Sequence, residues 1–182
     1  HQILPFEELP LNLKKKINLN QMIHHFQNQP YFWLGKFAEA KLAEDIELLL
    51  KYFSKILPSL IKLKDWQNLY LITEAISRVP ETKKELLAEK GIPDLRQAVW
   101  ANEAGELIRI LLTETPETRK GVEEIFLLLG EFGLQELYKN LLKEQDSSKR
   151  KLLIEGLIRF GPESIERLRD ILIDPAKPMN LH

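Results

Sequence analysis

The distribution of apolar residues along the chain predicts helices. Between positions 46 and 61, apolar side chains recur at steps of three and four residues, which is the spacing of one face of an α-helix. A second periodic segment, WQNLYLITEAISRV, follows the short polar stretch KLKD. Asp65 stands immediately before it, where a carboxylate can accept hydrogen bonds from the first amides of a helix. The two segments therefore predict an antiparallel helical hairpin with a short connection.

Proline and glycine residues mark the expected ends of helices. Pro58 is expected to kink or divide the first helix, because proline lacks an amide hydrogen and clashes with the preceding turn. A short third helix over residues 81–90 is expected to stop at Gly91. Asp94 then caps a longer helix whose apolar face extends to Leu112. No segment has the alternation of β-branched residues that is typical of a strand, so we predict an all-α protein.

One predicted helical hairpin occurs as two sequence copies in the C-terminal half. The copies read GVEEIFLLLGEFGLQELYKNLLKEQD and KRKLLIEGLIRFGPESIERLRDILID. Gly133 and Gly161, each after a phenylalanine, are 161 − 133 = 28 residues apart, and Gly130 and Gly133 are expected to terminate helices. Such repetition marks units that must stack on neighbours to bury their apolar faces. The same offset carries apolar residues onto apolar residues: Ile125, Phe126, Leu129 and Phe132 onto Leu153, Ile154, Leu157 and Phe160.

These patterns divide the chain into three regions. Residues 1–37 are expected to form an irregular or partly helical N-terminal extension or cap, in which Asn20 caps a short helix. Residues 38–174 form the repeat array. Residues 175–182 form a tail that reads as the start of a further, truncated repeat. Because the chain begins with His1 and not with methionine, we expect a fragment of a longer protein or a processed one.

The hairpins resemble HEAT-type repeats. An apolar helix ends in a glycine and a second helix ends in LL…D, as in LLLGEFGLQELYKNLLKEQD and GLIRFGPESIERLRDILID, and this is similar to the HEAT-like arrays of bacterial multidomain regulatory proteins. The segment KDWQNLYLITEAISRV shares the resemblance, which is good over residues 94–174, weaker over 40–93 and absent before about residue 38. It implies a right-handed α-α superhelix of antiparallel helical hairpins, a HEAT-like or armadillo-type α-solenoid that binds protein and, in some members, nucleic acid. HEAT repeats usually run somewhat longer than 28 residues, which leaves the superhelical curvature open.

Length, composition and charge exclude several classes of protein. At 182 residues, with 44% hydrophobic and 29% charged residues, the chain suits one domain or a short repeat array. It has no cysteine, which excludes disulfides, thiolate zinc sites and a cysteine nucleophile and is compatible with the cytoplasmic location that we expect. The net charge of −1 provides no overall attraction to nucleic acid or to anionic lipid. No apolar run reaches the roughly 18 residues of a membrane span.

Basic residues open the first helix of each repeat copy. If they line one rim of the array, they could contact phosphates or an acidic protein surface. The structural alternative is a ladder of ion pairs, such as Asp146 with Arg150 or Glu117 with Arg119, of the kind that HEAT-type units contain. We favour the ladder. The candidate contact residues are Arg119, Lys120, Lys149, Arg150 and Lys151.

Trp100 is the remaining candidate contact. It follows Val99 in a predicted helix, so both cannot lie at the centre of one apolar face, and an exposed tryptophan on a concave surface is typical of a binding hot spot. Packing between hairpins is the favoured alternative. Trp100 with Glu103 or Glu106 is also the nearest approach to the aromatic and acidic residues in the cleft of HEAT-like DNA glycosylases, although the near-neutral charge argues against DNA binding.

The chain carries no recognised catalytic or cofactor motif. His24 and His25 are adjacent, so on a helix they point about 100° apart and cannot share a metal ion. We therefore expect no enzyme activity, no cofactor and no metal. The main hypothesis is a scaffold that binds a protein partner, or another domain of its parent chain, through the inner helical surface. The alternative is a nucleic-acid-binding or DNA-repair protein that uses the basic rim, and a third hypothesis is self-association through the terminal repeats.

Overall fold

The computed structural model describes residues 18–173, and every regular element within that range is a helix. The all-α prediction is therefore confirmed for this part of the chain. Residues 1–17 of the predicted N-terminal extension, which include a run of three lysines at 14–16, lie outside the described residues, as do Asp174 and the predicted tail. The helices are α2 (Leu19–Asn28), α3 (Pro30–Glu39), α4 (Ala43–Lys62), α5 (Trp66–Ser77), α6 (Glu81–Glu89), α7 (Leu95–Trp100), α8 (Ala104–Thr113), α9 (Pro116–Lys143), α10 (Ser147–Ile158) and α11 (Pro162–Ile173).

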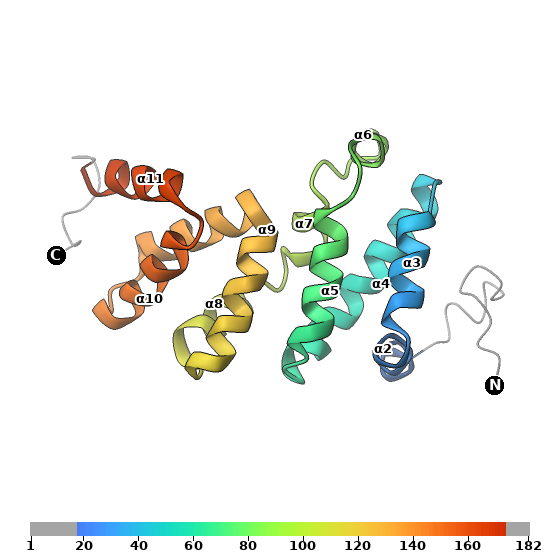
Figure 1. The fold of residues 1–182 in the computed structure, drawn as a ribbon, viewed down its shortest axis with the longest axis horizontal. Coiled ribbons are helices and arrows are strands. Elements are labelled where there is room, and N and C mark those ends of the chain that lie inside the picture. The colour runs from blue at the N-terminus through green and yellow to red at the C-terminus, as the bar shows by residue number, and fades with distance from the viewer. Residues whose placement is uncertain (1–17, 174–182) are drawn as a thin grey trace.

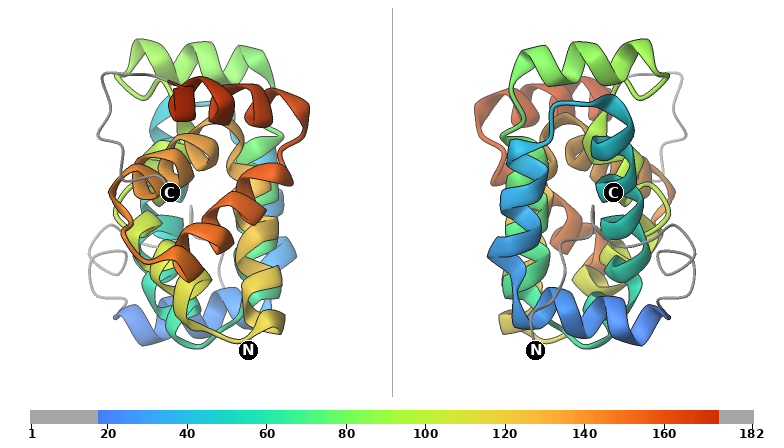
Figure 2. Two further views of the ribbon diagram at one scale, coloured as in Figure 1. Left: turned by 90° about the vertical axis from the view of Figure 1, so that its left-hand side faces the viewer. Right: turned by 90° about the vertical axis from the view of Figure 1, so that its right-hand side faces the viewer.

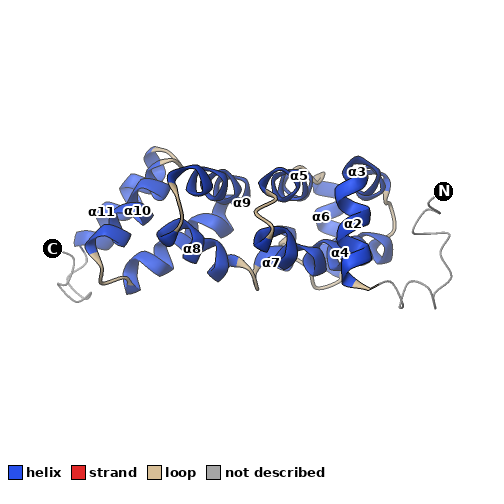
Figure 3. Ribbon diagram, turned by 90° about the horizontal axis from the view of Figure 1, so that it is seen from below, coloured by secondary structure: helices blue, strands red, loops and turns tan. Residues whose placement is uncertain are grey.

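The helices form an elongated arrangement of two layers. Helices α3, α5 and the first half of α9 follow one another in one layer, and α4, α7 and α8 follow one another in the other (Figures 1 and 3). Viewed along the long axis, α2 and α6 lie across opposite ends of these helices (Figure 2). One continuous cluster of buried apolar side chains fills the space between the layers and extends from Ile23 on α2 to Leu168 on α11. The predicted boundary between residues 37 and 38 falls inside α3, which packs on α5 as part of this core.

Helix α4 remains a single helix through Pro58, so Pro58 does not divide it. Pro58 lies on the solvent-facing side of α4, where the carbonyl that loses its amide partner can bind water. Leu57 and Leu60 on either side of it are fully buried, so packing holds the backbone in line. The predicted hairpin is confirmed, because α4 and α5 pack together across the short turn that ends at Asp65.

Side-chain caps begin several helices at the expected residues. Asp65 accepts from the backbone amide of Asn68, Asp94 accepts from the amides of Arg96 and Gln97, and Thr115 caps α9 just before the predicted start at Pro116. The first helix is an exception. Its cap is Asn18, not Asn20, and Asn18 forms a reciprocal capping box with Gln21.

The helix predicted from Asp94 to Leu112 is divided into α7 and α8 by a turn at residues 101–103. The two pieces have different main neighbours: α7 packs chiefly on α4 and α5, with a smaller contact on α9, whereas α8 packs on α9 and α10. One straight helix could not make both sets of contacts. The backbone amide of Glu103 closes the turn by donating to the carbonyl of Trp100 at 2.9 Å.

Helix α9 changes direction at Gly130, which has φ 56° and ψ −130°. This backbone conformation is accessible essentially to glycine alone. Gly133 does not terminate a helix, although this was expected of both residues. It is buried in the second half of α9, where a β-carbon would lie 2.4 Å from the carbonyl oxygen of Phe126, so it permits close approach of the two halves at the bend. Gly161, with φ 99°, separates α10 from α11 as predicted.

The two repeat copies are alike in burial, but not in the position of the turn. In the first helix of each copy, the residues paired by the 28-residue offset are buried together: Ile125 with Leu153, and Leu129 with Leu157. In the second helix the offset between matching buried residues is one residue shorter. Leu141 of the first copy matches Leu168 of the second, and 168 − 141 = 27. The difference arises because the first copy bends at Gly130, whereas the second breaks three positions later in that alignment, at Gly161.

Candidate functional site

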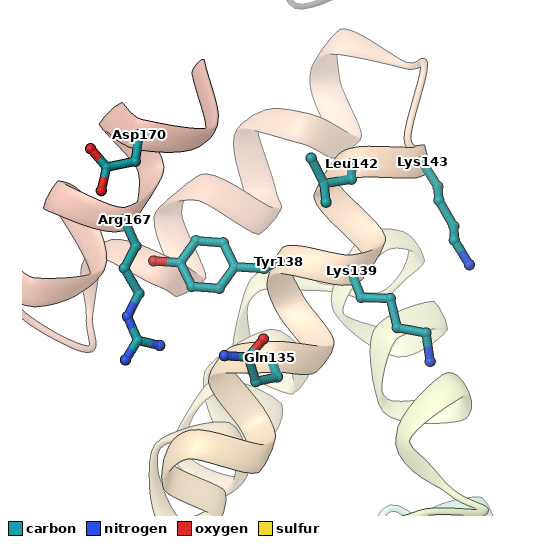
Figure 4. A pocket seen from close by; sticks show the side chains of 7 residues that line it. All are labelled: Gln135, Tyr138, Lys139, Leu142, Lys143, Arg167 and Asp170. Carbon is teal, nitrogen blue, oxygen red and sulfur yellow. The ribbon is translucent and has the colours of Figure 1, made fainter. Parts of the chain in front are cut away.

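An open groove lies between the second half of α9 and α11, with a volume of about 510 Å³ (Figure 4). It is lined by Gln135, Tyr138, Lys139, Leu142, Lys143, Arg167 and Asp170. The bend at Gly130 is what places the second half of α9 beside α11, because it turns this half out of the direction of the first. The groove was not predicted from the sequence.

Tyr138 forms the floor that joins the two helices. Its ring points from α9 toward α11 (Figure 4), and its hydroxyl donates to the carbonyl oxygen of Ser164 at 2.6 Å. The Ser164 hydroxyl is buried and donates to the carbonyl of Leu157 at 2.6 Å, which ties the start of α11 to the end of α10. Burial raises the pKa of the Tyr138 hydroxyl, so it remains a protonated donor across the neutral range. The groove therefore has a fixed polar floor.

The walls of the groove combine three cations with the Asp170 carboxylate on α11 and one exposed apolar side chain on α9. Arg167 donates to the Glu131 carboxylate at 2.8 Å, and this bond lowers the pKa of Glu131. Lys139 lies 3.7 Å from Glu136, a loose contact. Lys143 makes no side-chain hydrogen bond or ion pair with any described residue. Leu142 is 43% exposed. The groove can therefore accept a group that is apolar in one part and acidic in another.

The predicted rim residues occupy three different environments. Lys120 and Lys149 are exposed and Arg119 is half-buried, and the side chains of these three make no hydrogen bond or ion pair with the described residues. Lys151 is exposed and lies 4.0 Å from Glu155. Arg150 is half-buried and donates to the backbone carbonyls of Leu141 and Glu144. Arg150 thus closes the C-terminal end of α9, which is a structural role.

The ion pairs proposed for a ladder do not form between the predicted partners. The Asp146 carboxylate accepts from the backbone amide of Lys149 as the cap of α10, and Arg150 is engaged by carbonyls instead. A link between the two copies exists elsewhere. Arg159, at the end of α10, donates to both Glu123 and Glu124 on α9, each at 2.6 Å. Arg159 bears no sequence signature, because its partners lie 35 and 36 residues away.

Trp100 does not reach the surface, so it is not available as a partner contact, and it packs between helices as the favoured alternative predicts. It is fully buried, and its indole Nε1 donates to the hydroxyl of Thr73 at 3.2 Å. Glu106 is paired with Arg109, and the pKa of Glu103 is raised, chiefly by burial. The aromatic and acidic cleft suggested by the resemblance to DNA glycosylases therefore has no exposed tryptophan here.

None of the helices within the described range combines the length and the apolar character needed to cross a bilayer. Within the same residues, no group of three or more histidine, aspartate or glutamate side chains is placed to hold a metal ion. Comparison with protein-family models, with curated proteins and with solved structures finds no match to the chain.

Proposed function

We propose that the chain is an α-solenoid scaffold that binds a protein partner, or another domain of its parent protein, without catalysing a reaction. The layers support this proposal, since helices stacked side by side in two layers offer an extended surface. The observation that carries it is the groove between α9 and α11. An exposed leucine beside unpaired and loosely paired lysines, over a floor held by Tyr138, suits a peptide segment with apolar and acidic residues.

Site-specific photo-crosslinking tests this function. A photoreactive amino acid replaces Gln135 in the groove, and in a matched variant it replaces Gln67, which is exposed on α5 in another part of the array. The expected result is a protein partner crosslinked from position 135 and absent from position 67. That partner, once purified, is titrated against the Lys139→Glu, Lys143→Glu double variant, for which we expect at least about tenfold weaker binding. Equal crosslinking from both positions, or unchanged affinity of the double variant, contradicts the proposal.

Binding of nucleic acid through the basic rim is the second candidate function, and it rests on the three rim residues without partners in the described structure. The test is a low-salt titration with duplex and single-stranded DNA, repeated with Arg119, Lys120 and Lys149 changed to glutamate. Arg150 is left intact because it closes α9. Binding that falls steeply with added salt and is lost in the variant supports this candidate, and no binding at low salt eliminates it.

A further inference from the structure

A row of lysines without partners lies along the outer side of α4. The helix exposes one narrow stripe, and its residues are spaced by three or four positions as on a single face. From Leu48 onward the stripe contains no acidic residue, and three of its members are lysines. The stripe consists of Glu44, Leu48, Lys51, Lys55, Pro58 and Lys62.

None of the three lysines of this stripe has a carboxylate partner among the described residues, and they share one helix face. Lys64, Lys84, Lys90, Lys139 and Lys151 each lie within 4.0 Å of a glutamate carboxylate. Lys51, Lys55 and Lys62 make no ion pair or side-chain hydrogen bond with any described residue, although Glu47 lies one turn before Lys51. Three like charges on one face repel one another weakly, and a carboxylate-bearing ligand would remove that repulsion.

The stripe is also bounded by apolar side chains. From Leu48 to Lys62 it spans about 21 Å at the rise of an α-helix. Leu48 is 43% exposed, and Leu63, just beyond the end of α4, is 60% exposed. A second helix laid along α4 would bring side chains spaced by three or four residues against the lysines and apolar side chains against the two leucines. The charge and the length of the stripe together select an acidic amphipathic helix as its occupant.

We propose that the outer face of α4 binds an acidic amphipathic helix of a partner protein, as an interaction surface separate from the groove between α9 and α11. The fit is electrostatic, through Lys51, Lys55 and Lys62, with Leu48 and Leu63 as apolar contacts at the ends. Nucleic acid fits less well, because the stripe holds no arginine and no aromatic side chain to pair with or stack on bases.

The experiment is a fluorescence-anisotropy titration of the whole chain at low salt with a synthetic helical peptide. The peptide has a row of glutamates, flanked by leucines, along one face. A second peptide has glutamine in place of each glutamate, and a single-stranded oligonucleotide serves as a further probe. The stripe variant carries Lys51→Glu, Lys55→Glu and Lys62→Glu. A matched variant with the same change in net charge carries Lys41→Glu, Lys84→Glu and Arg169→Glu, at positions outside the stripe, the groove and the basic rim.

We expect the acidic peptide to bind, and the stripe variant and the glutamine peptide each to reduce affinity at least about tenfold, as the sum of several exposed charge pairs. The matched variant should bind within about twofold of the unchanged chain. Equal loss in both variants means that only net charge matters and overturns the proposal. So does tighter binding of the oligonucleotide than of the peptide, or no binding of the peptide at low salt. A triple Lys→Gln variant, which only removes the charges, keeps the test valid if the glutamate variant is misfolded.

Discussion

The indole nitrogen of Trp100 on α7 donates a hydrogen bond to the hydroxyl of Thr73 on α5, and both side chains are completely buried. Thr73 also donates to the carbonyl of Leu69, at 2.6 Å. A buried donor that loses its acceptor costs about 1 to 3 kcal/mol. Changing Thr73 to valine should therefore lower the free energy of unfolding by about that amount, measured by urea denaturation followed by circular dichroism.

Thr113 offers the matched control. Its hydroxyl also donates to a backbone carbonyl one turn earlier, that of Arg109, but the side chain is exposed. Thr113→Val should change the free energy of unfolding by no more than about 0.5 kcal/mol. If both valine variants had the same effect, the bond from Trp100 would not stabilise the core. In addition, Thr73→Val should cost less when Trp100 is already phenylalanine, since no buried donor is then left unpaired.

The second prediction concerns the stability of a variant at the bend in α9, Gly130→Ala. Gly130→Ala places a side chain in a conformation that residues other than glycine rarely adopt, with a β-carbon 3.1 Å from Nη1 of Arg96. We expect a loss of about 1 to 3 kcal/mol in the free energy of unfolding, measured by thermal and urea denaturation. Gly105→Ala is the control. Gly105 lies inside α8, and no atom would be within 4 Å of its β-carbon, so alanine there should stabilise the helix by about 0.5 to 1 kcal/mol. Two changes of the same sign would contradict the assigned backbone geometry.

The pair formed by Arg167 and Glu131 predicts a pH dependence. The hydrogen bond from Arg167 lowers the pKa of Glu131 below its ordinary value of 4.5 in the folded protein. The stabilisation is therefore fully present above pH 4.5 and is lost as the pH falls through the lowered pKa. Arg167→Gln should reduce the urea midpoint slightly at neutral pH and not at all in strong acid, because both groups are largely exposed.

Arg169→Gln is the control for this measurement, since Arg169 is exposed on the same helix and has no partner among the described residues. The two variants carry the same change in charge. A pH-independent effect of Arg167→Gln, or an equal effect of Arg169→Gln, would show that the pair does not contribute.

The sequence predicted local features well and distant contacts poorly. Asp65, Asp94 and Pro116 act within one turn of their own position, so the signals that begin their helices are complete in the sequence. Pro58 does not divide α4, because it lies on the side of the helix that faces solvent. The break after Trp100 was not predicted, because it depends on which neighbours α7 and α8 contact. Both are decided by packing.

The candidate site shows the same limit. Lys149 and its neighbours are conspicuous in the sequence, yet the groove depends on the bend at Gly130 and on Tyr138 meeting Ser164, which are 26 residues apart. The periodicity of α4 did indicate its apolar face. Only the structure shows that Lys51, Lys55 and Lys62 all lack a carboxylate partner, whereas Lys64, Lys84 and Lys90 each have one.

The layered arrangement also determines which helices should unfold locally first. The substantial contacts of each helix are with helices close to it in the chain, and the most distant such pair, α5 with α9, is separated by three helices. Such arrays are held together by nearest-neighbour interfaces and do not unfold as one indivisible unit. Helix α11 has its main interface with α10, so its amides should exchange with solvent earlier than those of α5, which packs on helices from both sides along the array. A ligand bound in the groove would contact both α9 and α11 and would reduce local opening of α11. Its binding should therefore be measurable as slower amide exchange in α11.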